Sequence, residues 1–193
     1  MRTTLFNPFK RYQAEKLIGV GLIFTVIGSV LAWLFNSRFD GIIDMHSFKK
    51  VALYQPFVDN AINIVLLLAV LFVIGKMQNH KTRFIDILAI CLVARTPLYI
   101  TPLFNIHDFM ARAAVHLEAI VNRSAAASEP LMMTLFILFS ILELLAIIWY
   151  LVLLYRGYKV SANTNGTLGI SLFVTAMILA EIASKFIFYN IKI

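Results

Sequence analysis

The sequence predicts an all-α fold, a polytopic integral membrane helical bundle with five transmembrane helices and short interfacial helices. Composition is the first observation behind this prediction. Hydrophobic residues make up 61% and charged residues 14% of the 193 residues, against about 45–50% and about 25% in soluble domains. The second is that the apolar residues gather into five runs. Each run is long enough to cross about 30 Å of hydrocarbon at about 1.5 Å per helical residue. No stretch keeps the alternation of a membrane β-barrel strand.

The polar and basic residues 1–16 precede these runs and are expected to form a cytoplasmic amphipathic segment. Residues 17–193 are expected to form one five-helix transmembrane domain. The first run is a full span with no cleavage signal before it, so we expect it to stay in the membrane. Its small residues Gly21, Gly28 and Ser29 favour close helix packing. The expected spans are residues 17–36, 57–75, 84–104, 131–155 and 168–189.

Two further segments have the spacing of amphipathic helices and are expected to lie at the membrane interface rather than to span the membrane. Phe6, Phe9 and Tyr12 recur at every third position beside basic residues, which predicts a short helix on the inner membrane surface. Apolar residues recur with helical spacing over residues 105–123, which predicts a second helix along the outer surface.

Basic residues in the flanks predict the orientation, because Lys and Arg are more frequent in cytoplasmic loops. One side has nine in three short segments, and the other has six in longer segments. The N-terminus is therefore expected inside and the C-terminus outside. The nine are Arg2, Lys10, Arg11, Lys16, Lys76, Lys81, Arg83, Arg156 and Lys159, and the six are Arg38, Lys49, Lys50, Arg112, Arg123 and Lys192. These flanks and anionic headgroups account for the net charge of +7 without nucleic acid.

Four charged residues lie deep within the apolar runs and form the predicted buried charge cluster: Arg95, Glu143, Glu181 and Lys185. A charge at the bilayer centre costs about 3 kcal/mol even on the lenient insertion scales. Glu181 and Lys185 are four residues apart and can pair on one helix face, which leaves Arg95 for Glu143. One interpretation is an ion-pair network that fixes which helices touch. The other is a polar cavity that carries protons, ions or a lipid headgroup.

Polar residues also open the second span, where Asp59, Asn60 and Asn63 share one helix face. They indicate either a solvated helix start at the outer interface or a polar vestibule leading to the central charges. In the third span Pro97 and Pro102 follow Arg95, and each proline frees an upstream carbonyl.

Motifs for catalysis are missing from the sequence, which has no GxSxG, GxGxxG, phosphate loop or HExxH pattern. We therefore expect no enzyme activity, catalytic residue, metal site or cofactor. His46, His107 and His116 lie in the outer loops near carboxylates acceptable to zinc. They leave a metal-dependent membrane enzyme as a third alternative. The single cysteine, Cys91, forms no intramolecular disulfide.

Short stretches spread over most of the chain carry a resemblance to a known family. They are Asn7-Pro8-Phe9, Ile27-Gly28-Ser29, Phe35-Asn36, Arg38-Phe39-Asp40-Gly41, Lys81-Thr82-Arg83, Ile85-Asp86-Ile87 and Ala94-Arg95-Thr96-Pro97-Leu98-Tyr99. With five spans and a polar N-terminal segment, the chain resembles the Yip1-domain membrane proteins, and most closely the bacterial members that open with Asn-Pro-Phe. The resemblance implies a bacterial cytoplasmic (inner) membrane protein without catalytic residues.

The function expected from these features is a non-enzymatic, Yip1-like membrane-organising or adaptor role. The alternative is a small transporter or ion-conducting protein that uses Arg95, Glu143 and Glu181. Membrane lipids are the expected partners, with a protein partner or a homo-oligomer left open.

Overall fold

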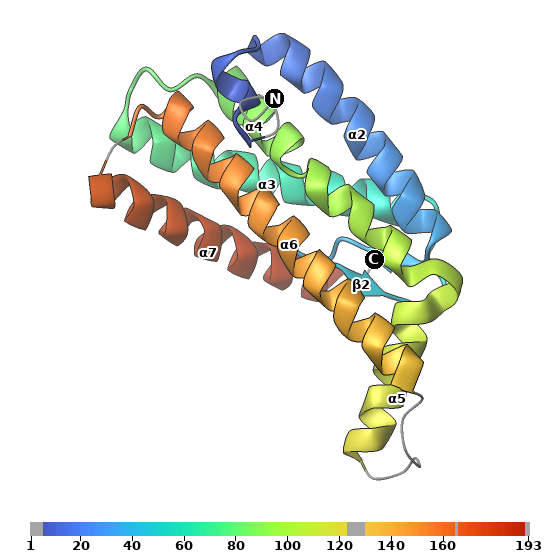
Figure 1. Ribbon diagram of the computed structural model, residues 1–193. Coiled ribbons are helices and arrows are strands. Elements are labelled where there is room, and N and C mark those ends of the chain that lie inside the picture. Colours follow the sequence, from blue (N-terminus) through green and yellow to red (C-terminus); the bar gives the residue numbers. More distant parts are fainter. Residues whose placement is uncertain (1–5, 123–129, 165, 192–193) are drawn as a thin grey trace.

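The computed structural model describes residues 6–122, 130–164 and 166–191 (Figure 1). Helices dominate it, so the all-α prediction is confirmed. Within the described residues, five helical segments are long and apolar enough to cross a membrane, and the third of them runs over Phe84–Val121. The elements in chain order are η1 (Pro8–Lys10), α2 (Ala14–Leu34), β1 (Ser37–Arg38), β2 (His46–Ser47), α3 (Tyr54–Gln78), α4 (Phe84–Ala94), η2 (Thr96–Asp108), α5 (Phe109–Val121), α6 (Pro130–Ser161) and α7 (Gly166–Ile191).

Small residues bring α2 against the α4–η2 segment, as the sequence predicts. A Cβ added at Gly28 would lie 2.3 Å from the ring of Tyr99, and one at Gly21 would lie 2.6 Å from the Cβ of Leu92. Only glycine permits backbones this close. Ser29 is also buried, but it contacts α3, where it accepts a hydrogen bond from Asn60 at 2.9 Å.

The third span changes its helix type at Arg95 and Pro97. The α-helix α4 ends at Ala94 and is followed by the 3₁₀ turns of η2 (Thr96–Asp108), because a proline inside a helix removes a backbone donor. Non-helical backbone angles at Asn105, Ile106 and His107 interrupt η2. His107 and Asp108 take left-handed backbone angles, with φ of 52° and 57°. The chain turns at these two residues, so α5 begins at Phe109, four residues later than the helix expected over residues 105–123.

In the described part of the N-terminal segment, residue 6 is helical and the 3₁₀ turn η1 follows at Pro8–Lys10, and aromatic residues of the segment contact α6. Phe6 lies 6.2 Å from Trp149 between ring centroids, and Phe9 lies close to Gly157, where an added Cβ would be 2.9 Å from its Cε2. Aromatic packing therefore fastens this segment to the helix bundle.

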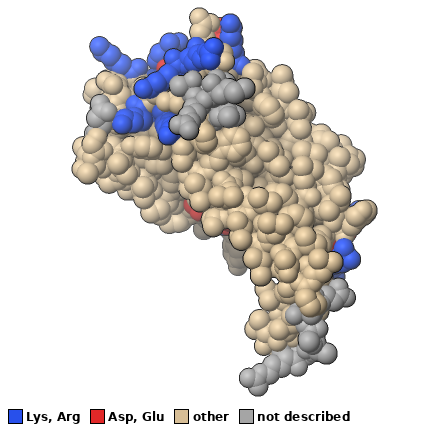
Figure 2. Space-filling model, in the orientation of Figure 1, with Lys and Arg blue, Asp and Glu red and all other residues tan. Residues whose placement is uncertain are grey.

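Charge is distributed unevenly between the two ends of the molecule. The end that carries η1, the α3–α4 loop and the end of α6 has eight described Lys and Arg residues against Glu15 and Asp86, a balance of +6. The rest of the described chain has six basic and seven acidic residues, a balance of −1. Figure 2 shows most visible basic side chains at the η1 end, beside a wide belt with almost no charge. Arg2, Arg123 and Lys192 lie outside the described residues.

Candidate functional site

The most highly connected polar site surrounds a loop between α2 and α3, here called the inserted loop (residues 37–47). Its ends pair as a short antiparallel hairpin, with Ser37 opposite Ser47 and Arg38 opposite His46. Between the strands the chain enters the core, where Phe39 is 1% exposed and Ile42 is fully buried. Buried backbone of this kind needs hydrogen-bond partners, because an unsatisfied peptide group costs about 1–3 kcal/mol.

Arg95 binds the inserted loop through the carbonyl of Ile42. The side chain is fully buried at the end of α4. Its Nη1 donates to the Ile42 oxygen at 3.0 Å, and its Nη2 donates to Oδ1 of Asn60 at 3.3 Å. The guanidinium carbon also lies 5.8 Å from the ring centroid of Phe39. A charged donor in this dry position makes the stronger class of hydrogen bond.

Glu181, which lies much later in the sequence, binds the same peptide region. Its Oε2 accepts hydrogen bonds from the backbone N–H groups of Ile42 and Ile43, at 3.0 and 3.1 Å. Lys185 forms an ion pair with Asp44 of the loop and lies 4.0 Å from Oε1 of Glu181. A Cβ at Gly41 would lie 2.9 Å from that oxygen. The loop is thus held by its carbonyl through Arg95 and by its amides through Glu181.

The second span supplies the remaining contacts to the loop. Asp59 accepts two hydrogen bonds from Arg38, 2.9 Å from Nε and 2.6 Å from Nη2. Asn63 donates to the carbonyl of Phe39 at 2.7 Å. Asp59, Asn60 and Asn63 share one face, as predicted, but all three are fully buried. Neither a solvated helix start nor an open vestibule describes them, because their polar groups bind the loop, Arg95 and Ser29.

The expected pair of Arg95 with Glu143 is wrong. Among the described residues, no ion pair joins these two side chains. The reason is that the Ile42 carbonyl and Asn60 take two of the guanidinium nitrogens of Arg95. Glu143 is half-buried on α6. The expected Glu181–Lys185 pair is present at 4.0 Å, although Lys185 lies closer to Asp44.

Sequence reasoning missed Arg38, which it counted only as a flanking charge. The signal that could have identified it is Asp59, a carboxylate at the start of an apolar span that requires a partner. Arg38 lies 21 residues earlier in a turn-like stretch that contains Asp40 and Gly41.

His46 and Asp40 form a hydrogen bond that joins the two ends of the inserted loop. The ring Nδ1 of His46 lies 2.8 Å from Oδ1 of Asp40. This hydrogen bond raises the pKa of His46 above its ordinary value, against the lowering effect of burial. Burial raises the pKa of Asp40, but the hydrogen bond to His46 and the charges of His46 and Lys185 together outweigh burial, so the pKa of Asp40 falls. Across the described residues, no group of three His, Cys, Asp or Glu side chains could hold a metal ion.

Among the described residues, Lys185 is the only one of the four central charges that lines one of the larger surface hollows. One hollow lies between the N-terminal segment and the end of α6, another beside the α6–α7 turn, and a third beside Lys185 and Phe186. Arg95, Glu143 and Glu181 are not among the described residues that line these three hollows.

Comparison with known proteins does not identify a function for this site. No family model, curated protein or solved structure matches the chain. Its function must therefore be argued from the geometry of the inserted loop and the distribution of charge.

Proposed function

We propose that this chain is a non-enzymatic integral membrane protein with a membrane-organising or adaptor role, of the Yip1 type. In this proposal it resides in a bacterial cytoplasmic membrane, with the N-terminus inside and the C-terminus outside. The observation that carries the proposal is that Arg95, Glu181, Lys185 and Asp59 all bind the inserted loop.

Ionisable residues at membrane depth are a functional-site hypothesis unless a structural role accounts for them. Here the structural role is specific, since Arg95 and Glu181 satisfy the buried peptide groups of Ile42 and Ile43. A transporter needs charges that a substrate or proton can reach. An organising protein needs a rigid helix bundle with defined surfaces. Hydrogen bonds that hold the loop in the core make the bundle rigid.

Orientation in the proposal follows from the uneven charge of the two ends. The η1 end has a balance of +6 among described residues, and the remainder has a balance of −1. The positive-inside tendency assigns the η1 end to the cytoplasm. The expected partners are membrane lipids and either a second copy of the chain or another membrane protein.

One specific observation favours a small transporter as the second candidate. Arg95 Nε, Asn63 Oδ1 and the hydroxyl of Tyr150 are buried and have no hydrogen-bond partner among the described residues. Glu143 likewise has no ion pair within the described chain. Buried polar atoms of this kind commonly bind water, and a hydrated route would pass through them.

The test is to reconstitute the full chain in liposomes and to measure proton, Na⁺ and K⁺ flux. The organising role expects fluxes equal to those of empty liposomes. It also expects a stoichiometric complex, with itself or a partner, in mild detergent. Flux that Glu143→Gln abolishes, with an unchanged melting temperature, would overturn the proposal in favour of transport. Glu118→Gln is the matched control, because Glu118 is exposed on α5.

A further inference from the structure

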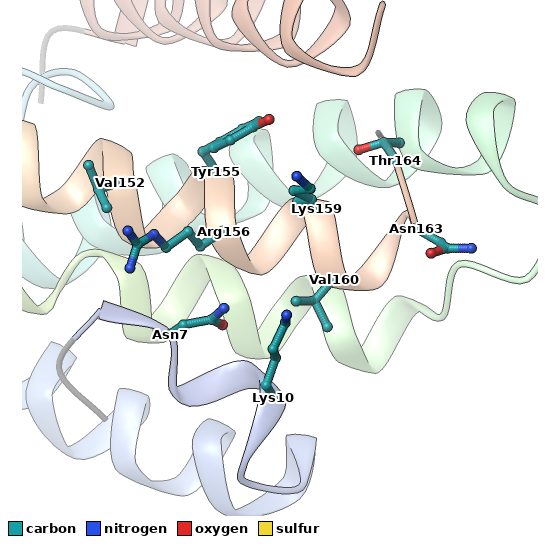
Figure 3. Close-up of a pocket in the computed structure, with 9 residues that line it drawn as sticks. All are labelled: Asn7, Lys10, Val152, Tyr155, Arg156, Lys159, Val160, Asn163 and Thr164. Atoms are coloured by element: carbon teal, nitrogen blue, oxygen red, sulfur yellow. The ribbon is translucent and has the colours of Figure 1, made fainter. Parts of the chain in front are cut away.

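A pocket at the basic end of the molecule is lined by residues of the N-terminal segment and of α6 (Figure 3). Its cavity volume is about 700 Å³. Lys10, Arg156 and Lys159 supply three cationic side chains to its lining. No Asp or Glu in the described chain lines it. We call it the basic pocket, and it lies at the other end of the bundle from the inserted loop.

The basic pocket changes from polar to apolar along α6. Lys159, Asn163 and Thr164 line it at the end of the helix, and Val152 lines it deeper in the span. At about 1.5 Å per residue, Val152 lies about 10 Å further along the helix than Lys159. A ligand that fills this space meets cations at one end and an apolar wall at the other.

The N-terminal segment closes one side of the pocket. Figure 3 shows Lys10 extending from this segment toward α6, and Arg156 extending from α6. Arg156 holds the segment itself, since its Nη1 lies 3.4 Å from the Phe6 carbonyl and its guanidinium carbon 5.8 Å from the Phe6 ring centroid. Oδ1 of Asn7 is buried without a hydrogen-bond partner among the described residues. That oxygen is an acceptor available to a hydroxyl group.

We propose that the basic pocket binds the headgroup of an anionic phospholipid that carries a hydroxyl, such as phosphatidylglycerol. The phosphodiester lies among Lys10, Arg156 and Lys159, and a headgroup hydroxyl donates to Asn7. The acyl chains follow the apolar wall formed by Val152 and Tyr155. The apolar wall and its depth favour a lipid over free phosphate, which would use the cations alone. Basic pockets between helices at the cytoplasmic surface commonly take such headgroups.

Zwitterionic lipid is the natural comparison for this site. Phosphatidylcholine carries the same phosphodiester but adds a quaternary ammonium, and no carboxylate of the described chain lines the pocket to balance it. The site is therefore expected to bind phosphatidylglycerol more tightly than phosphatidylcholine with acyl chains of the same length.

The test is native mass spectrometry of the full chain in neutral detergent, titrated with short-chain phosphatidylglycerol, phosphatidylcholine or inorganic phosphate. We expect phosphatidylglycerol to bind at least about tenfold more tightly than phosphatidylcholine. Lys10→Gln/Lys159→Gln should weaken phosphatidylglycerol binding about 25-fold, since each lysine near an anionic headgroup contributes about fivefold. Both lysines are exposed, so the melting temperature should not change.

The control is Lys16→Gln/Lys81→Gln, which removes two exposed lysines from the same end but outside the basic pocket. It should change the affinity for phosphatidylglycerol by less than about threefold. An equal loss of affinity for phosphatidylglycerol in both double variants would show that the lipid is held only by non-specific attraction to the basic end. Competition by inorganic phosphate at the affinity of the lipid would make it a free-anion site. Either result overturns the lipid site and leaves the organising role, tested by flux and complex formation, unaffected.

Discussion

At the residue scale, the buried Arg38–Asp59 pair joins the inserted loop to the second span. Asp59 is fully buried and Arg38 is 8% exposed. Both oxygens of the carboxylate bind the guanidinium, which is the bidentate geometry that arginine favours. Removing one member leaves the other charge buried without compensation.

Arg38→Leu or Asp59→Leu alone should therefore lower the stability of the protein by about 3–5 kcal/mol. The double variant should recover much of that loss, because no unpaired charge remains. The matched comparison is Arg95→Leu with Glu143→Leu, whose effects should add without recovery because the two residues are not paired. Thermal unfolding in detergent measures both cycles. Additive effects in the Arg38–Asp59 cycle would show that this pair does not couple.

The His46–Asp40 contact makes closure of the inserted loop depend on pH. The raised pKa of His46 means that its contribution is fully present below the ordinary histidine pKa and is lost as the pH rises through the raised value. The lowered pKa of Asp40 means that its contribution is lost only as the pH falls through that lower value. The pair is therefore strongest between the two pKa values.

Amide exchange of residues 40–47, corrected for intrinsic rates, should be slower at pH 6 than at pH 8. His46→Gln should remove the difference. The exchange of amides at the end of α3, at the η1 end of the molecule, serves as the internal reference. A pH dependence that survives in His46→Gln would assign the effect to another group.

At the element scale, the contact of α2 with the α4–η2 segment depends on glycine. A Cβ at Gly28 would lie 2.3 Å from the Tyr99 ring, whereas Gly19 on the same helix has nothing within 4 Å. Gly28→Ala should destabilise the protein by about 1–3 kcal/mol through overpacking. Gly19→Ala should be neutral or stabilising by up to about 1 kcal/mol, because alanine is the better helix former. Melting temperatures in one detergent compare them, and equal shifts would rule out the close contact.

The helices themselves could be predicted from the sequence because each depends on a local run of apolar residues. The expected span over residues 57–75 lies within α3, and the expected span over residues 168–189 lies within α7. The change at Arg95 follows from Pro97, which the sequence also displays. The turn at His107 and Asp108 was missed, since left-handed backbone at these residues has no apolar pattern to reveal it.

The partners of the buried charges could not be predicted in the same way. The four central residues were identified from hydrophobic context alone, but their contacts join distant parts of the chain. Glu181 binds the amide of Ile42, 139 residues away, and Arg95 binds its carbonyl, 53 residues away. A prediction that matches each buried charge with an opposite charge leaves out backbone N–H and C=O groups. A loop folded into the core supplies many of these groups.

At the scale of the whole molecule, the structure combines five long apolar helices with one loop folded into their core. The basic pocket and the +6 balance lie at the η1 end. The inserted loop joins α2 and α3 at the other end, where Arg95 and Glu181 hold it. In the proposed orientation, the lipid site faces the cytoplasm and the loop is sealed toward the outside.

The most direct test of this account is the accessibility of Ile42. In a Cys91→Ala background, Ile42→Cys and Lys49→Cys are each treated in intact cells with a membrane-impermeant maleimide. Ile42 is fully buried and Lys49 is exposed in the same interhelical connection. The account predicts rapid labelling of Lys49→Cys, almost none of Ile42→Cys, and labelling of Ile42→Cys once Arg95→Leu is added. Labelling of Ile42→Cys as fast as Lys49→Cys, with Arg95 intact, would contradict the inserted loop.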